Sequence, residues 1–258
     1  MSPTARAKQA IEAQLAAVKA GDNDALLAMF APDAEILAAH ARVVKPSLDL
    51  VSRIAMLNPH ASLVSATLKD LTAGGTDGAV WLDAEVEVVL SSSEEGGAGG
   101  KVTHPMRIVE LLDGSTGKIV TGSFAQPAPA AQLGATHGEL PNPTAEGPLS
   151  KLLTAPVDLA NALASDPNVF VLGTELAERA TGPDAARKLL GHWNKLKLTI
   201  EEQDKVHEVH TAAWGFAMAN VNLVKGSGDP YRMTGLVIGV PTTGGAGWSV
   251  VAIVYDAI

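Results

Sequence analysis

The sequence predicts an α+β protein of two related domains, each with helices at its start and a meander of mainly antiparallel strands after them. An internal repeat is the main observation. The strand pattern around Val80-Trp81-Leu82 returns around Ala213-Trp214-Gly215, and a Gly-rich gap then leads to a strand that begins at Pro105 or Pro230. Two copies are too few for a solenoid. The 258 residues suffice for two domains of roughly 110–130 residues, each with its own core.

The predicted boundaries follow from one Pro-rich stretch. Residues 127–148 hold prolines at 127, 129, 141, 143 and 148, with three glycines between them. That composition continues neither a helix nor a central strand, so we expect a semi-extended linker there. The first domain is then residues 1–126, and the second is residues 149–258.

The first domain is expected to begin with two helices. Ile11, Leu15 and Val18 form one helical stripe within residues 5–20. Gly21 ends this helix, and Asp22 or Asn23 is a suitable cap for a second, short helix. That helix is expected to carry an apolar stripe of Leu26, Leu27 and Phe30.

A turn at Pro32-Asp33 leads into a short strand at 35–39, and Pro46 begins a third predicted helix. From Ala61 the hydrophobic period changes to that of strands. Four strands are expected, near 61–71, 78–91, 100–112 and 117–125.

Alternation is clearest in the strand over 79–90. One face is wholly apolar and predicts the side that packs on the core: Val80, Leu82, Ala84, Val86, Val88 and Leu90. The other face carries Trp81, Asp83, Glu85 and Glu87, and is expected to meet solvent or another sheet. The Ser/Gly-rich residues 91–100 after it predict a flexible hairpin tip.

The second domain repeats this order with a shorter helical start. Helical fragments are expected at 149–154 and 157–164, interrupted by Pro156, with a strand at 168–172 after them. Thr181-Gly182-Pro183-Asp184 is a strong helix start, and an apolar stripe follows it. Four strands are then expected, near 197–209, 211–224, 230–240 and 247–256.

Composition excludes several classes of function. The net charge is −9 and no basic cluster is present, which disfavours nucleic acid and anionic membranes as partners. The absence of cysteine excludes disulfides and thiolate metal sites. No apolar run is long enough for a secretory signal or a membrane span, so we expect a cytoplasmic protein.

Both halves resemble nuclear transport factor 2-like domains of the SnoaL-like or ketosteroid-isomerase-like branch. In the second half, the resemblance rests on 170–175, Thr181-Gly182-Pro183, Ala213-Trp214 and 248–251. In the first half it rests on the two opening helices, on 30–35 and on Val80-Trp81. The similarity covers nearly everything except the linker.

The resemblance implies a cone-shaped domain whose helices and curved sheet enclose a pocket. Members of this branch use the pocket for isomerisation, dehydration, cyclisation or epoxide opening, or only to bind, so the fold does not decide the function. Active members place Asp, His or Tyr in an apolar pocket, where burial tunes the pKa. Members also commonly dimerise through their sheets, which implies that a tandem chain forms a pseudo-dimer within itself.

Asp83 and Glu85 are the candidate catalytic acids, with His40 as a partner near the pocket mouth. They serve in proton transfer if their strand face lines the pocket, and they are ordinary charges at a surface or interface if it does not. Alternation favours the second interpretation. The second copy weakens the first further, because Phe216 and Met218 stand where Asp83 and Glu85 stand in the first copy.

Trp81, Trp214 and Tyr231 are the candidate ligand-binding residues; core or interface packing is the alternative for the tryptophans. His207 and His210 do not predict a metal site, because residues three apart on a strand point to opposite faces. Neither a metal nor a cofactor is expected.

We therefore expect a protein that binds a small apolar molecule rather than an enzyme. One alternative is a cofactor-independent isomerase, dehydratase or cyclase that uses a carboxylate of the first domain. The other is a protein-interaction module. A ligand cavity is expected in the first domain, since the shorter helical start of the second should leave its pocket shallow or filled by Trp214, Phe216 and Met218.

Overall fold

The computed structural model describes residues 1–38, 42–48, 61–92, 100–125, 156–173, 177–195, 199–203, 207–209, 212–221, 231–241 and 248–256. Three expected features lie outside these residues: the linker, the helical fragment at 149–154 and most of the helix after Pro46. His40, His210 and residues 93–99 of the hairpin tip lie outside them as well. No helix among the described residues is both long enough and apolar enough to cross a membrane.

The first half begins with helix α1 (Pro3–Ala20) and the short helix α2 (Asn23–Leu27). The Ser2 side chain accepts a hydrogen bond from the Ala5 amide at the start of α1, and Gly21 ends the helix in the left-handed conformation, at a φ of 67°. Asp22 caps α2, as the sequence predicts, by accepting a hydrogen bond from the Ala25 amide. The strands that follow are β1 (Phe30–Ala38), β2 (Arg42–Val44), β3 (Ala61–Gly75), β4 (Ala79–Ser92), β5 (Lys101–Asp113) and β6 (Ile119–Ala125).

Phe30 is expected in the second helix, but in the structure it begins β1 and does not belong to α2. Pro32-Asp33 lies inside this strand and not in a turn before it. The pairing of β1 with β6 shifts in register between Phe30 and Glu35, which is where the proline falls. A proline lacks the N–H that a regular ladder needs, and an irregularity in pairing accommodates it.

The second half contains two helices among the described residues, α4 (Pro156–Ala162) and α5 (Pro183–Lys195). Pro156 begins α4; proline suits the first helical position because its missing N–H has no partner there. The strands are β7 (Phe170–Leu172), β8 (Arg179–Thr181), β9 (Thr199–Gln203), β10 (His207–Val209), β11 (Ala212–Val221), β12 (Tyr231–Pro241) and β13 (Trp248–Asp256).

The two sheets have the same strand order. The first is β2-β1-β6-β5-β4-β3, and the second is β8-β7-β13-β12-β11, with β9 and β10 pairing successive parts of β11. In each sheet one central pair is parallel, β1 with β6 or β7 with β13, and the other pairs are antiparallel. The expected α+β class, with helices before mainly antiparallel sheets, is confirmed.

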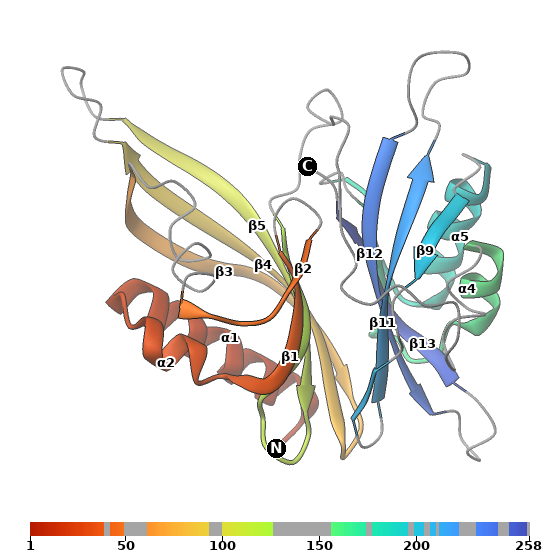
Figure 1. The fold of residues 1–258 in the computed structure, drawn as a ribbon, viewed down its shortest axis with the longest axis horizontal. Helices are drawn as coiled ribbons and strands as arrows, with labels where there is room; N and C mark the ends of the chain where they lie inside the picture. Colours follow the sequence, from red (N-terminus) through yellow and green to blue (C-terminus); the bar gives the residue numbers. More distant parts are fainter. Residues whose placement is uncertain are drawn as a thin grey trace.

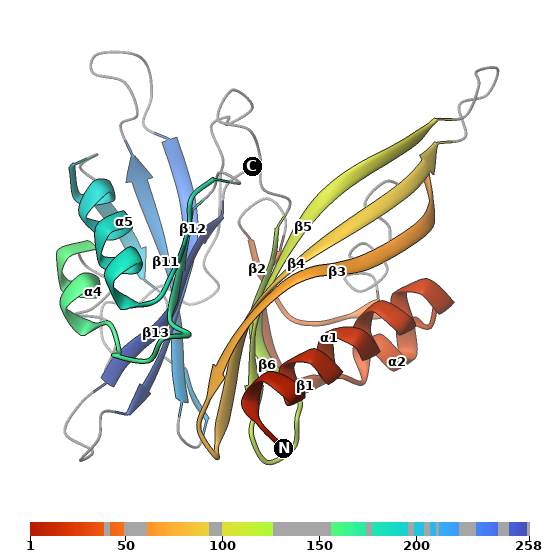
Figure 2. The same cartoon turned by 180° about the vertical axis from the view of Figure 1, so that it is seen from behind.

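The two sheets lie face to face in the middle of the molecule. Helices α1 and α2 cover the outer side of the first sheet, and α4 and α5 cover the outer side of the second (Figure 1). Seen from behind, β3, β4 and β5 bend away from the second sheet and rise above α1 (Figure 2). The first sheet is therefore covered by helices on one face and by the second sheet on the other.

Strand β4 contributes to two separate cores. Its apolar face, with Val80 and Leu82, packs with Ala7 and Ile11 of α1, as the alternation predicts. On its other face, Trp81 belongs to a second cluster of buried residues drawn from both sheets. That cluster includes Leu37, Val109 and Leu111 from the first half and Trp214, Phe216, Leu236 and Ile238 from the second. The interface interpretation of this face is therefore the one that the packing supports.

Polar contacts join the same two sheets at defined points. The indole Nε1 of Trp81 donates to the carbonyl of Asn168 at 3.2 Å. Its ring lies so close to Gly74 that a Cβ atom there would stand 2.5 Å from two ring carbons. Arg107, itself buried, donates from Nη1 to the carbonyl of Gly173 at 2.8 Å. These bonds satisfy polar groups that the contact removes from water.

Arg179 of β8 faces three carboxylates of the first sheet. Its Nε donates to Asp83 Oδ2 at 2.9 Å, and its Nη1 lies 2.8 Å from Asp70 Oδ2 and 3.3 Å from Glu85 Oε2. The Asp83 side chain is 1% exposed. Burial raises its pKa above the ordinary value, and the nearby charges of Arg179 and Arg107 act against that rise.

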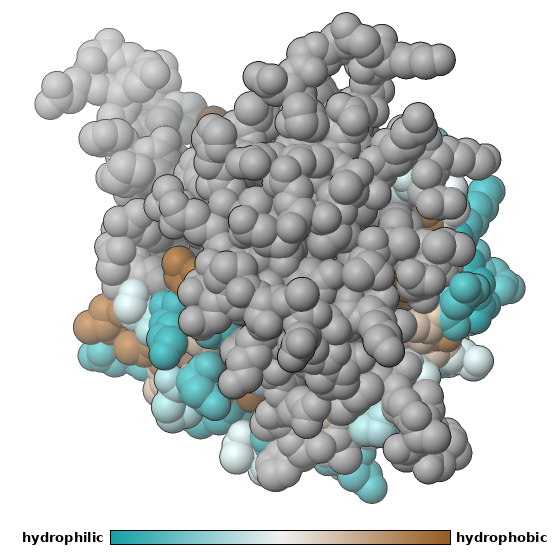
Figure 3. Space-filling view, turned by 45° about the vertical axis from the view of Figure 1, so that its right-hand side comes forward, coloured by the Kyte–Doolittle hydropathy of each residue, from teal (hydrophilic) through white to brown (hydrophobic). Residues whose placement is uncertain are grey.

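Large hydrophobic side chains are exposed at four described positions: Met1, Leu48, Val64 and Val102. On the coloured part of the face in Figure 3, hydrophilic residues predominate and hydrophobic ones form small separate areas. Single exposed hydrophobic residues are normal on a protein surface. The interaction-module hypothesis, which needs a large contiguous patch, stays a prediction.

The burial of Asp83 gives the first testable prediction. Replacing Arg179 with Met leaves a buried carboxylate without its cation, and we expect this to lower the free energy of unfolding by about 3 kcal/mol. The double variant Arg179→Met/Asp83→Leu should recover much of the loss, because the unpaired charge is gone. Arg187→Met is the control, since Arg187 lies on the surface beside Asp184 and its loss should cost under about 0.5 kcal/mol. Urea denaturation measures all three. Equal losses in Arg179→Met and Arg187→Met would contradict the prediction.

Candidate functional site

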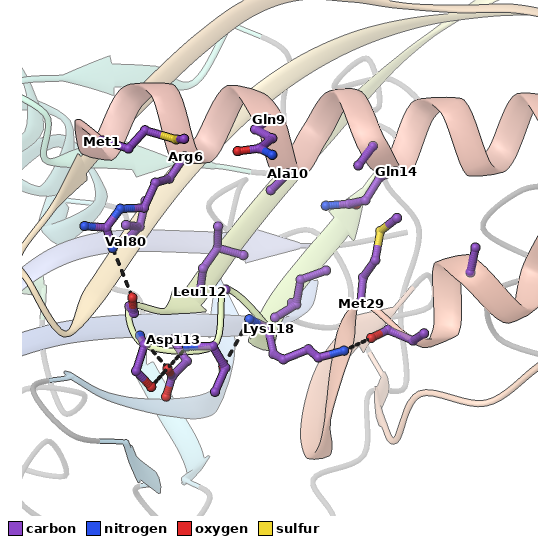
Figure 4. Close-up of a pocket in the computed structure, with 18 residues that line it drawn as sticks. Met1, Arg6, Gln9, Ala10, Gln14, Met29, Val80, Leu112, Asp113 and Lys118 are labelled. Atoms are coloured by element: carbon purple, nitrogen blue, oxygen red, sulfur yellow. Dashed lines mark hydrogen bonds between the residues drawn. The ribbon is translucent and has the colours of Figure 1, made fainter.

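A pocket of about 720 Å³ lies between α1, the end of α2 and the turn that joins β5 to β6. Its volume is within the range of small-molecule sites. The apolar part of the lining comes from α1, from the residue before β1 and from the sheet: Ala10 and Ala13, Met29, and Val80, Leu112 and Ile119. The polar part includes Arg6, Gln9, Gln14, Asp113 and Lys118. Figure 4 shows α1 along one side of the pocket and the β5–β6 turn along the other.

The β5–β6 turn is held in shape by its own side chains. Asp113 Oδ1 accepts hydrogen bonds from the Ser115 amide, the Ser115 hydroxyl and the Thr116 amide. Burial acts to raise the pKa of Asp113, but these hydrogen bonds outweigh it and hold the pKa below the ordinary value. Gly117 adopts a φ of 69°, which favours glycine. A Cβ atom at Gly114 would stand 2.4 Å from the Asp77 carbonyl oxygen, so the turn also packs closely on the β3–β4 connection.

Two cationic side chains tie this turn to the helices. Arg6 of α1 donates from Nη1 to the carbonyl of Gly114 at 3.1 Å. Lys118 donates from Nζ to the carbonyl of Ala28, just after α2. Both bonds are drawn in Figure 4. They bridge opposite walls of the pocket and orient both cations beside it.

Glu110 is a buried acid behind the pocket. It belongs to β5 and is fully buried, and its Oε2 accepts a hydrogen bond at 2.9 Å from Gln14 Nε2 of α1. Its other carboxyl oxygen has no hydrogen-bond partner among the described residues. Burial raises the pKa of Glu110 to about 8, against a smaller lowering by Gln14. Because Gln14 also lines the pocket, it connects the pocket to this acid.

Sequence reasoning did not select Glu110, although the chain carried a signal for it. Glu110 pairs with Leu82 of β4, the apolar face of which packs on α1. Together with Ile108 and Leu112 it forms the corresponding face of β5, where it is the charged member of an apolar row. On its other side it pairs with Gly122 of β6. A charged residue on the core-facing side of a strand is a good candidate for a functional site. Once buried, such a residue must either be paired with another group or be neutral.

The residues chosen from the sequence lie elsewhere. Asp83 and Glu85 face Arg179 between the sheets and are not part of the pocket lining. Trp81 and Trp214 belong to the cluster between the sheets. Tyr231 begins β12, and His40 lies outside the described residues. The catalytic and ligand-binding roles expected of these residues stay predictions.

The described residues contain no group of three His, Asp or Glu side chains that is able to hold a metal ion. His207, Glu208 and Val209 form the short strand β10, which pairs with the start of β11.

No protein-family model and no curated protein matches the chain. Solved structures do show similarity. A nuclear transport factor 2-like (NTF2-like) protein from Cytophaga hutchinsonii is 13% identical, with a TM-score of 0.36 over 46% of this chain and 93% of that one. A ketosteroid isomerase-like protein from Erwinia carotovora atroseptica is 13% identical, with a TM-score of 0.35 over 49% of this chain and 97% of that one. Each of these two matches spans about half of this chain.

The buried acid gives the second prediction. Glu110 keeps a proton in the folded state up to about pH 8, whereas in the unfolded chain it releases that proton near pH 4.3. Between these values the unfolded state binds fewer protons, so the free energy of unfolding falls as the pH rises. Glu110→Gln removes this titration, and we expect the variant to lose less stability than the wild type between about pH 5 and pH 8, by up to about 1.4 kcal/mol for each pH unit.

Chemical denaturation across this pH range makes the measurement. Glu12→Gln is the matched control, because Glu12 is an exposed carboxylate of α1 that pairs with Lys8 on the surface. Its pH profile should follow that of the wild type. If Glu110→Gln also follows the wild type, the buried acid does not hold its proton as described.

Proposed function

We propose that the first half of the chain binds a small, mainly apolar molecule in the pocket between α1 and the β5–β6 turn. The observation that carries this proposal is the pocket itself, whose volume of about 720 Å³ suits a small organic ligand. Alanines on α1 and aliphatic side chains of the sheet supply the apolar contact area, and Gln9, Gln14, Arg6 and Lys118 supply polar groups that orient a ligand. All these residues come from the first 119 positions, so the proposed ligand belongs to the first half.

We further propose that the second half is the covalent equivalent of a partner subunit. The shared strand order of the two sheets supports this, as do the contacts of Trp81, Arg107 and Arg179 between them. In this arrangement the second sheet covers the face of the first that is turned away from the pocket. The ligand-binding wall is thereby held rigid without a second copy of the chain.

A second candidate function, proton transfer, is supported by Glu110. A carboxyl with a pKa of about 8 exchanges protons near neutral pH, which is what general acid–base catalysis requires. Its contact with Gln14 places it one side chain away from the pocket. In this second proposal, Gln14 rotates away, the protonated Glu110 carboxyl donates its proton to the carbonyl oxygen of the bound molecule, and water takes the proton from the α-carbon, so that an enol forms; the reverse steps return a solvent proton to that carbon. That places the acid on the face of the sheet opposite to the one that carries Asp83 and Glu85.

The binding proposal is tested with N-phenyl-1-naphthylamine, a neutral probe that fluoresces strongly in apolar sites. We expect the wild type to enhance its fluorescence with saturable binding. Ala10→Phe should weaken binding at least about tenfold, because the added ring occupies the pocket. Ala16→Phe is the control: it places the same ring on the exposed side of α1 and should leave binding unchanged. Equal binding by both variants would place the probe elsewhere and contradict the proposal.

The proton-transfer candidate is tested with 2-tetralone, an apolar bicyclic ketone, in deuterated buffer near neutral pH. The wild type should exchange its α-hydrogens at least about a hundredfold faster than Glu110→Gln does, as expected for loss of a general acid–base group. Nuclear magnetic resonance follows the exchange. Equal rates in the two proteins, with the neutral probe still bound by both, would leave ligand binding as the function and remove catalysis.

A further inference from the structure

We propose that the ligand is an amphipathic organic anion, with an apolar body and a single oxyanion headgroup such as a carboxylate, and that this headgroup binds at one of the two cations of the lining, Arg6 or Lys118, which lie apart beside the pocket (Figure 4). The inference rests on the ligand-binding function proposed above and names the chemical class of its ligand. It follows from the distribution of charge in the pocket and from the way in which the two cations are held.

The charge around the pocket has the opposite sign to that of the chain. The protein carries a net charge of −9, yet the charged side chains of the described lining are two cations, Arg6 and Lys118, and one carboxylate, Asp113. Asp113 is turned into the β5–β6 turn, where one of its oxygens accepts three hydrogen bonds. A positive balance in a partly enclosed site attracts an anion more strongly than the same charges do on an open surface.

Both cations are held in place but retain donors. A guanidinium has five N–H donors and an ammonium has three. Arg6 donates one to Gly114 and Lys118 donates one to Ala28, so each has others to offer an oxyanion. Since these bonds already restrict the two side chains, a ligand loses less conformational entropy when it engages them. A carboxylate also fits the fork of a guanidinium, with which it forms charge-assisted hydrogen bonds.

The interior of the pocket does not oppose an anion. Glu110 is the acid behind the lining, and its pKa of about 8 keeps it uncharged at neutral pH. The remaining contact area is apolar, with Ala10 and Ala13 on one wall and Leu112 and Ile119 on the other. An alkyl or aryl body suits this area, whereas a highly charged ligand such as a nucleotide would bring more negative charge than two cations balance.

The test compares decanoate with decan-1-ol as competitors of N-phenyl-1-naphthylamine, both below their aggregation concentrations. The measured quantity is the ratio of the dissociation constants of decan-1-ol and decanoate. The hydrophobicity of each ligand is the same for every protein, so its effect cancels when the ratio for a variant is compared with the ratio for the wild type. We expect the preference for decanoate over decan-1-ol to fall at least about tenfold in Arg6→Gln/Lys118→Gln, because a carboxylate loses a charge-assisted hydrogen bond and an alcohol does not. Each glutamine removes the positive charge but still has an amide N–H donor for the carbonyl of Gly114 or Ala28 that the native side chain contacts. Arg187→Gln, at a surface cation of α5, is the control and should keep the wild-type ratio.

The outcomes separate the two proposals. If the neutral probe binds and Ala10→Phe blocks it, but the ratio is the same in the wild type and the double variant, the anion inference is wrong and ligand binding stands. If the neutral probe does not bind in the pocket, the proposed function itself fails. Should the double variant unfold, salt gives a second measurement on the wild type. Raising sodium chloride from about 50 mM to about 500 mM should weaken decanoate relative to decan-1-ol, and an unchanged ratio would overturn the inference.

Discussion

The first sheet has to be covered on both faces, because its central strands carry apolar side chains on each of them. On β4, Val80 and Leu82 pack against α1 and Trp81 packs toward the second sheet. A helical layer covers one face, and only another large apolar surface covers the other at comparable density. The second sheet supplies that surface from the same chain. The positions of α1 and of the pocket beneath it depend on this arrangement, since they require a sheet that is rigid from behind.

Charged residues give the contact between the sheets its register. Hydrophobic burial is not directional, so the cluster around Trp81 would tolerate several alignments of the two sheets. The hydrogen bonds of Trp81 to Asn168 and of Arg107 to Gly173, together with the ion pair of Arg179 with Asp83, are satisfied in one alignment. A buried ion pair adds little net stability against an apolar pair of the same shape, and its best-attested use is to fix orientation. We infer the same use here.

The sequence was sufficient for features that depend on local pattern. Alternation along β4 identifies the face that packs on the core, and Asp22 is one of the two cap candidates that the sequence offers, because short-range hydrogen bonding decides that position. The sequence was not sufficient where contacts between residues far apart in the chain decide the structure. The short strands β2 and β8 lack a pattern of their own and form because a neighbouring strand offers an edge. Arg179 meets Asp83 across 96 positions of the chain, and Gln14 meets Glu110 across another 96, so neither partner was visible to a search along the sequence.

The salt bridge between the sheets has a consequence for how this chain can change over evolution. In a dimer of identical subunits with twofold symmetry, every residue appears on both sides of the interface, so an acid introduced on one side is introduced on the other as well. Here β4 carries Asp83, while the matching place on β11, counted from the two repeated tryptophans, is Phe216. One linked chain permits this asymmetry because each side mutates alone. A linked pair of related domains is therefore free of the symmetry restriction that binds two identical subunits, and a charge such as that of Asp83 needs no copy on the other side.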